Sequence, residues 1–312
     1  MSTSAITTNM DTSAANTQYT YSFKEGDGQN KKLLGGKGAN LCEMTQIGIN
    51  VPPGFVISTE ACLGYLDTED RELPPGLMDE VHNQINDLEQ ATGKGFGDAE
   101  NMLLLSVRSG SALSVPGMMD TILNLGLTSE TLPGMIKQKG NERFAWDAYR
   151  RFIQLFGKVA LSIADEKFDR PFEELKKREG VTADIDLSAD NLREISDVFL
   201  DVVQGETGRP FPEDVYDQLA LSIKAVFNSW SGKRAVDYRR EFKITTDMAN
   251  GTAVNIQTMV FGNMGDDCAT GVGFTRNPAT GENAMFGEFL VNAQGEDVVA
   301  GIRTPKPVHE LE

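Results

Sequence analysis

The middle of the chain carries a helical pattern over about one hundred residues, and this pattern restricts the possible folds more than any other feature. Apolar residues recur every three or four positions after Asn141, which is a good N-cap, and again after Ser188 and before Gly232. We therefore expect at least three packed helices between residues 130 and 230. The charged segment 169–188, "DRPFEELKKREGVTADIDLS", is predicted to be an exposed loop. The three apolar stripes are Ala145, Tyr149, Phe152, Ile153, Phe156, Val159, Ala160; Leu192, Ile195, Phe199, Val202; and Val215, Leu219, Ile223, Val226, Trp230.

Segments on both sides of these helices have β-type patterns. At the front, residues 21–34 indicate a strand, a turn and a second strand, and 38–48 indicate a helix of about three turns that Gly48 closes. Residues 51–59, "VPPGFVIST", are predicted to be extended, and "MLLLSVR" to be a buried strand that ends at Arg108. Beyond residue 243, short apolar runs punctuated by Asn, Pro and Gly favour a second sheet. The expected fold class is α/β (α+β), and further sheet is expected where the chain stops at "HELE".

Composition excludes several classes of protein. No stretch approaches eighteen consecutive apolar residues, so no membrane-spanning helix is predicted. A net charge of -17 argues against nucleic-acid binding. The tail 1–20 is rich in Ser and Thr and has no basic residue, so we expect it to be disordered and the protein to be cytoplasmic. The three cysteines are far apart and fit neither a disulfide framework nor a zinc site.

A glycine-rich turn, "LLGGKGANLCEM", is the first candidate for a phosphate site. We expect it at a strand-to-helix junction, where the amide groups of a first helical turn point outward and the helix dipole favours an anion. A P-loop is excluded because Lys31 and Gly38 stand where Gly and Ser or Thr belong, and a dinucleotide fingerprint is excluded by Leu41. On the turn alone, a tight turn with a solvated Lys37 remains an alternative.

Further candidates lie at a distance along the chain. Arg108 ends a buried strand beside a Gly/Ser loop, where its fork of donors can bind phosphate or an acidic neighbour. Glu288 and Glu296 lie eight residues apart on what we expect to be extended chain, and glutamates at a polyphosphate site hold ribose hydroxyls, magnesium or a basic partner. Two edge-strand charges are the alternative. The basic segment 232–243 either receives an anion or pairs with its acidic neighbours.

Together these segments resemble a known family. The sequences that carry the resemblance are "LLGGKGANLCEM", "GINVPPGFVIST", "SVRSG", "PGMMDTILNLG", "RFAWDAYRRFIQLFG", "AVNIQTMVFGNMG" and "GFTRNPATGENAMFGEFLVNAQGEDVVAGIRTP". They look like the N-terminal nucleotide-binding domain of the pyruvate, phosphate dikinase family, from about Tyr21 to Pro307.

The resemblance implies a fold and an activity. The fold is ATP-grasp, in which two α/β lobes clamp ATP. Residues 21–127 with 214–256 would form the first lobe, 128–213 an inserted helical subdomain, and 257–312 a second lobe that is incomplete at its C-terminal sheet. The family converts ATP, orthophosphate and pyruvate to AMP, diphosphate and phosphoenolpyruvate through a phosphohistidine. A phosphoenolpyruvate synthase fragment and a non-catalytic nucleotide-binding remnant are the alternatives.

The resemblance also implies roles for single residues. Lys37 and Arg108 would hold the ATP phosphates and stabilise charge during transfer, and the loop around Gly117 would close over them. Gln257 would lie near the adenine, and Glu288 and Glu296 on the ribose and phosphate side. Ligands for Mg²⁺, the phosphohistidine and the pyruvate domain are expected downstream of this chain. We therefore expect the chain alone to bind Mg-ATP weakly or not at all and to be inactive.

Overall fold

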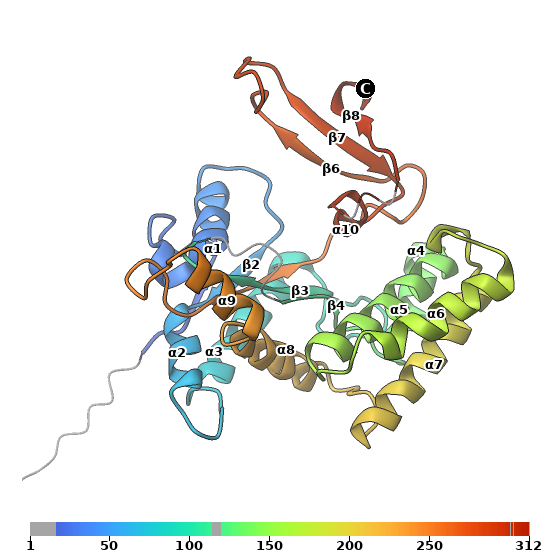
Figure 1. The fold of residues 1–312 in the computed structure, drawn as a ribbon, viewed down its shortest axis with the longest axis horizontal. Coiled ribbons are helices and arrows are strands. Elements are labelled where there is room, and N and C mark those ends of the chain that lie inside the picture. The colour runs from blue at the N-terminus through green and yellow to red at the C-terminus, as the bar shows by residue number, and fades with distance from the viewer. Residues whose placement is uncertain (1–16, 114–119, 300, 302, 312) are drawn as a thin grey trace, which may run out of the picture.

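The computed structural model describes residues 17–113, 120–299, 301 and 303–311 (Figure 1). Most of the tail 1–20 lies outside this range. The architecture is mixed α/β, with two antiparallel sheets and ten α-helices in the described part of the chain. Of the helices in these ranges, none is long and apolar enough to cross a membrane.

The larger sheet collects strands from both ends of the described chain. Its order is β1-β2-β5-β3-β4, and every neighbouring pair is antiparallel. The central strand β5 comes after the helical middle of the chain, so the polypeptide leaves this sheet after β4 and returns to its centre. The strands are β1 (Thr20–Ser22), β2 (Gly54–Ile57), β3 (Leu105–Gly110), β4 (Thr121–Leu125) and β5 (Ala253–Thr258).

Each face of this sheet is covered by different helices, because alternate residues of a strand point to opposite faces. Helix α1 (Lys31–Gln46) lies on one face, where its Leu34, Ala39 and Cys42 pack with Val56 and Ala253 (Figure 1). The other face carries the larger core and is covered by α2 (Thr59–Leu66), α3 (Leu77–Thr92) and α8 (Val215–Ser229). The strand residues of that core include Phe55, Ile57, Leu105, Val107, Ile122, Val254 and Ile256.

The predicted helices of the middle region are confirmed. Asn141 accepts a hydrogen bond from the Phe144 amide at 3.0 Å, and Ser188 forms a capping box with Asn191. The third predicted stripe, Val215 to Trp230, lies on α8. This helix ends at Ser229, with Trp230 as its C-cap, shortly before Gly232. The helices of this region that precede α8 are α4 (Thr131–Lys139), α5 (Glu142–Val159), α6 (Glu166–Glu179) and α7 (Ala189–Thr207).

The predicted loop at 169–188 is partly wrong, because α6 covers its first half. Phe168, Phe172 and Leu175 are buried and lie four and three residues apart, which gives a narrow apolar stripe on an otherwise charged helix. These three side chains pack against the neighbouring helices, and this packing stabilises α6 although Pro171 lies inside it. A short 3₁₀ turn, Asp184–Asp186, follows before α7.

The smaller sheet has the order β6-β7-β8 and lies apart from the larger one (Figure 1). It confirms the β-type pattern beyond residue 243. Helix α9 (Lys233–Glu241) precedes β5, and α10 (Gly295–Val299) follows β7 and lies between the two sheets. The strands are β6 (Ala269–Phe274), β7 (Phe286–Val291) and β8 (Lys306–Pro307), and a 3₁₀ turn covers Val308–Glu310.

A strand over residues 31–34 is also a wrong prediction, because α1 already begins at Lys31. The Asn30 side chain accepts a hydrogen bond from the Leu33 amide at 3.1 Å and so caps the helix. The helix then kinks at Gly35, whose φ of 68° and ψ of 165° are not helical. A Cβ on Gly35 would lie 1.9 Å from the carbonyl oxygen of Gly110, so only glycine fits at this contact between α1 and β3.

We predict that Gly35→Ala destabilises the chain by about 3 kcal/mol or more, because it adds a backbone clash to the strain of a positive φ. Gly48→Ala is the matched control. Gly48 also has a positive φ, 88°, but a Cβ there would have open space, so its cost should be about 1 kcal/mol. Urea unfolding of both variants measures the difference, and equal costs would contradict the close approach at Gly35.

Candidate functional site

The face of the larger sheet that α1 covers carries three of the residues singled out by sequence. Arg108 lies opposite Asn255 of β5, and Gln257 lies opposite Ser106, so both side chains point to the same face as Gly110. A Cβ on Gly110 would lie 3.4 Å from the Cβ of Lys37, which identifies this face as the one that meets α1. The fold therefore brings Lys37, Arg108 and Gln257 onto one surface.

The Lys37 ammonium lies close to β3 and to a second cation. Its Nζ donates a hydrogen bond to the carbonyl oxygen of Ser109 at 2.8 Å. Burial, together with the positive charge of Arg108, lowers the pKa of Lys37 to about 8. The Lys37 side chain is partly buried and hydrogen-bonded, so the solvated lysine that the sequence left open as an alternative is not favoured. Two like charges on a partly dehydrated surface favour an anionic ligand, because an anion compensates both the repulsion and the lost hydration.

The glycines around Lys37 act differently from the prediction. The expected strand-to-helix junction is a kink inside α1, and the Gly36 amide donates to the carbonyl oxygen of Ser111 at 2.8 Å. A Cβ on Gly38 would lie 2.9 Å from the side chains of both Val56 and Asn255. These glycines thus let α1 approach β2, β3 and β5 closely, and the Gly36 amide already has a protein acceptor.

Gln257 is almost fully buried at the edge of the same surface. Its Nε2 donates to the carbonyl oxygen of Pro52 at 3.0 Å. The side chain is thereby held against the segment that leads into β2. The next residue, Thr258, ends β5, after which the chain continues toward the smaller sheet.

The remaining predicted site residues lie elsewhere. Glu288 is exposed on β7 of the smaller sheet, opposite Val272 and Pro307. Glu296 lies in helix α10, so the expectation that both glutamates are on extended chain is wrong for Glu296. Gly117 lies outside the described residues. The structure thus groups Lys37, Arg108 and Gln257 on the larger sheet and places Glu288 and Glu296 in the segment of β7 and α10.

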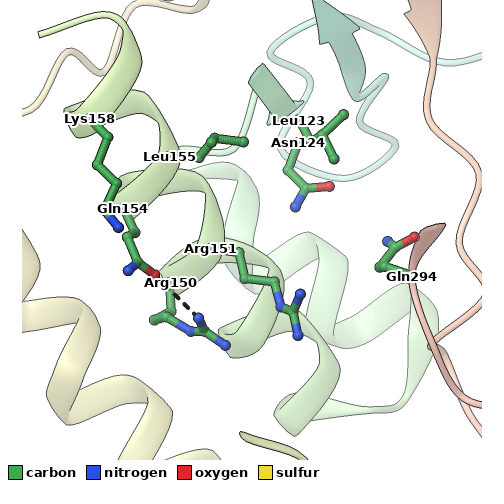
Figure 2. A pocket seen from close by; sticks show the side chains of 8 residues that line it. All are labelled: Leu123, Asn124, Arg150, Arg151, Gln154, Leu155, Lys158 and Gln294. Atoms are coloured by element: carbon green, nitrogen blue, oxygen red, sulfur yellow. Dashed lines mark hydrogen bonds between the residues drawn. The ribbon is translucent and has the colours of Figure 1, made fainter. Parts of the chain in front are cut away.

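A pocket of about 270 Å³ lies beside that segment, between α5, β4 and the residue before α10 (Figure 2). Cationic and amide side chains dominate its lining, and most of them come from one side of α5. Its lining residues are Leu123, Asn124, Arg150, Arg151, Gln154, Leu155, Lys158 and Gln294.

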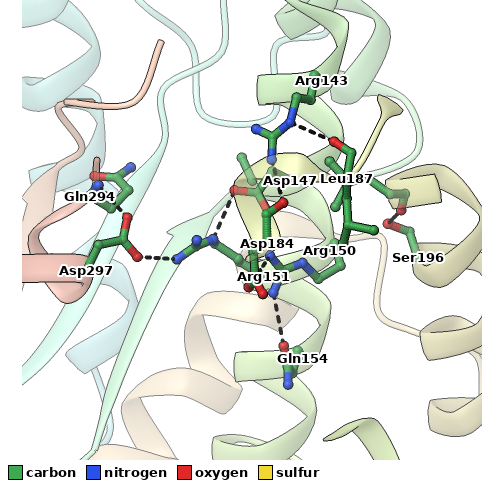
Figure 3. Close-up of polar contacts among 12 residues, drawn as sticks. Arg143, Asp147, Arg150, Arg151, Gln154, Asp184, Leu187, Ser196, Gln294 and Asp297 are labelled. Carbon is green, nitrogen blue, oxygen red and sulfur yellow. Dashed lines mark hydrogen bonds and ion pairs between the residues drawn. The ribbon is translucent and has the colours of Figure 1, made fainter. Parts of the chain in front are cut away.

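An ion-pair network next to this pocket joins α10 to α5 (Figure 3). Arg151 contacts Asp147 of its own helix at 3.0 Å and Asp297 of α10 at 3.2 Å. The other carboxylate oxygen of Asp297 accepts a hydrogen bond from the backbone amide of Gln294 at 2.9 Å. Arg150 also contacts Asp147. Burial alone would raise the pKa of Asp147, but the surrounding arginines outweigh it and hold this pKa below its usual range.

Sequence reasoning did not identify Arg151 and Asp297. The only local signal for Arg151 is the arginine doublet in "YRRF". These two positions follow the apolar Tyr149 at the border between the apolar and the polar side of the predicted helix. Asp297 lies 146 residues farther along the chain, and no pattern indicates this distant partner.

The basic segment 232–243 forms α9 and pairs largely with its own residues. Lys233 and Arg240 both contact Asp237, the latter at 2.8 Å. The Arg239 guanidinium lies 3.7 Å from the ring centroid of Trp230. For Lys233 and Arg240, pairing with an acidic neighbour is therefore the better of the two interpretations.

Within the described ranges, no group of three or more His, Cys, Asp and Glu side chains could hold a metal ion. The described cysteines Cys42, Cys62 and Cys268 are all free thiols, and the first two are buried.

Comparison with known proteins identifies the family. A family model described as "Pyruvate phosphate dikinase, AMP/ATP-binding domain" matches residues 31–74 and 68–309. A pyruvate, phosphate dikinase of Entamoeba histolytica is 56% identical over 294 residues, which cover 94% of this chain and 33% of that protein. The dikinase of Clostridium symbiosum is 49% identical, over 95% of this chain and 34% of its own length. Pyruvate, phosphate dikinase 1, chloroplastic, of Arabidopsis thaliana is 52% identical, over 92% and 29%.

The chain thus spans about a third of the length of these relatives. The matched residues include α1, the larger sheet from β2 onward, the helical region and the smaller sheet. The chain therefore belongs to the pyruvate phosphate dikinase family and corresponds to its AMP/ATP-binding domain.

Proposed function

We propose that this chain supplies the ATP site of a pyruvate, phosphate dikinase and that Lys37 and Arg108 bind the ATP phosphates. The observation that carries the proposal is the pair of cations. Lys37 and Arg108 are 71 residues apart in the sequence and lie on one face of the larger sheet. The positive charge of Arg108 contributes to the lowered pKa of Lys37. The family description and the names of the relatives support ATP as the ligand.

In the proposed division, the two lobes of an ATP-grasp fold enclose the nucleotide. Residues 21–127 and 214–256, which hold most of the larger sheet with α1–α3, α8 and α9, would be the first lobe, and 128–213 the helical subdomain. Residues 257–312, with the smaller sheet, belong to the second lobe. The arrangement of two separate sheets, connected by the chain segment between β5 and β6, is consistent with two such lobes (Figure 1).

Lys37 and Arg108 would act on the phosphates in different ways. Arg108 presents a planar fork that can contact two phosphate oxygens, whereas Lys37 provides a single mobile ammonium. Negative charge is spread over the equatorial oxygens as a phosphoryl group is transferred, so fixed cations lower the barrier without moving. When ATP binds, the Lys37 ammonium exchanges its bond to the Ser109 carbonyl for a phosphate oxygen.

The other predicted residues would complete the cleft. Gln257 would lie near the adenine, and the loop around Gly117 would cover the phosphates. Glu288 and Glu296 would lie on the ribose and phosphate side of the cleft. The Arg151–Asp297 ion pair would help to position α10, which carries Glu296.

Mg²⁺ prefers carboxylate oxygens, and the described residues offer no cluster that fits it. We therefore assign no metal ligand within the described part of this chain. ATP phosphates and residues of the full-length protein would hold the metal.

The proposed reaction of the full-length protein converts ATP, orthophosphate and pyruvate to AMP, diphosphate and phosphoenolpyruvate. A phosphohistidine outside this chain would carry the phosphoryl group to a pyruvate domain. All three relatives described above bear the dikinase name, so the phosphoenolpyruvate synthase alternative is not favoured. A non-catalytic nucleotide-binding remnant would share the ATP affinity that the next two predictions measure, and the absence of turnover in the full-length protein would identify it.

Arg108→Ala should weaken Mg-ATP binding by about tenfold or more, because it removes charge-assisted hydrogen bonds to phosphate. Arg143→Ala is the matched control. Arg143 donates to the carbonyl oxygens of Leu187 and Asp184 at 2.8 and 2.7 Å, so its loss should lower stability and leave ATP affinity unchanged. Calorimetric titration at millimolar ATP, with urea unfolding of each variant, separates the two effects. If both variants change only stability, Arg108 is a structural arginine.

Mg-ATP affinity should fall as the pH rises through about 8, the pKa of Lys37. The protonated lysine binds phosphate, so above this pH the protein must take up a proton on binding, and Kd should rise by up to about tenfold per pH unit. Binding raises the pKa of Lys37, so the decline ends at the pKa of the complex. Lys37→Arg keeps its charge over this range and should show a flat profile. A pH-independent Kd for the unaltered chain would exclude Lys37 from the phosphate site.

A further inference from the structure

Asn255 occupies the centre of the surface that carries the candidate phosphate site. It lies on β5, the middle strand, with Val56 of β2 on one side and Arg108 of β3 on the other. Its side chain points toward α1 and is fully buried, with 0% exposure. Asn255 is thus a buried polar residue between the helix of Lys37 and the strand of Arg108.

The Asn255 amide contacts both of these elements. Its Nδ2 donates to the carbonyl oxygen of Arg108 at 3.3 Å. A Cβ on Gly110 would lie 2.6 Å from this Nδ2, and a Cβ on Gly38 would lie 2.9 Å from Oδ1. Glycines at 38 and 110 therefore make room for the amide, which fills the space between α1 and β3.

Packing alone does not account for an amide at this position. The Asn255 Oδ1 is buried and has no hydrogen-bond partner among the described residues. A buried acceptor without a partner costs about 1–3 kcal/mol, which an apolar side chain would avoid. Ala253 on the same face of β5 and Val56 beside Asn255 on β2 show that this face accommodates apolar side chains.

The charges nearby suggest what the amide provides. Lys37 and Arg108 are positive and lie close enough for one to affect the other. An amide offers a hydrogen-bond donor and an acceptor beside these cations and carries no net charge. A carboxylate of the same shape would form ion pairs with them and compete with phosphate for the same groups.

We propose that Asn255 is a positioning residue for this site, whose neutral amide holds the backbone of Arg108 and the helix of Lys37 in place without adding a negative charge beside the two cations. The proposal rests on the function proposed above. It assigns to Asn255 no contact with the nucleotide.

The isosteric change Asn255→Asp tests the requirement for a neutral group. We expect it to raise the pKa of the Lys37 ammonium by about one unit or more, because a carboxylate stabilises the protonated form. We also expect it to weaken Mg-ATP binding by about tenfold or more, with the fold intact by circular dichroism. The Lys37 pKa is followed by NMR of the side-chain Cε, and affinity by titration with Mg-ATP.

Asn124→Asp is the matched control. Asn124 is also buried, its Nδ2 donates to the carbonyl oxygen of Ala148 at 3.3 Å, and its Oδ1 has no partner among the described residues. It lies beside α5, so this substitution should lower stability and leave the Lys37 pKa unchanged. Asn255→Ala should weaken Mg-ATP binding about fivefold through loss of the bond to Arg108, with the Lys37 pKa unchanged.

A folded Asn255→Asp chain with unchanged Lys37 pKa and ATP affinity would overturn the proposal. Should that variant not fold, Asn255→Ala decides, and an unaltered affinity overturns it. Failure of the proposed function has a different signature. The unaltered chain would then show no saturable response to Mg-ATP, while the Lys37 pKa in Asn255→Asp would still report on the role of Asn255.

Discussion

The close contact between α1 and β3 is the constraint on which the candidate site depends. At Gly35 the helix backbone meets the carbonyl of Gly110 with no room for a Cβ, and at Gly38 it meets Val56 and Asn255 in the same way. This contact places Lys37 over β3, buries part of its side chain, and exposes its ammonium to the field of Arg108. The depressed pKa of Lys37 is thus a consequence of backbone packing, because a helix held farther away would leave the ammonium in water.

The site then needs a second part of the chain that can approach this surface. The smaller sheet is joined to the rest through the segment after β5 and through α10, which an ion pair holds against α5 (Figure 3). A single ion pair that is only partly buried contributes modestly to stability, and its geometry matters more than its energy. It places α10 against α5 of the helical region.

Local sequence signals predicted the elements well wherever one element could be recognised by itself. Asn141 and Ser188 marked helix starts because a side-chain cap acts within three residues, and the apolar stripes after them fixed the buried faces. The errors at 31–34 and 169–188 arose where tertiary contacts decide. Leu34 becomes helical because it packs under Val56 and Ala253, and α6 is helical because Phe168 and Phe172 are buried by neighbouring helices.

The assembly of the site was less accessible to sequence reasoning. Glycine-rich surroundings singled out Lys37 and Arg108, but only the family resemblance implied that they act together. No local pattern indicates the return of β5 between β2 and β3, on which their mutual approach depends. Arg151, Asp297 and Asn255 lie in segments that carry the resemblance but were not singled out, because the contacts that matter here join them to residues more than a hundred positions away.

The most direct test of the Lys37–Arg108 phosphate site is the pKa of the Lys37 ammonium, measured by NMR with and without Mg-ATP. In the free chain this pKa should be near 8, and saturating Mg-ATP should raise it toward or above the ordinary lysine value of 10.5, because phosphate stabilises the protonated amine. A free-chain value already near 10.5, or a value that Mg-ATP leaves unchanged at saturation, would contradict the assignment of Lys37 and Arg108 as the phosphate-binding pair.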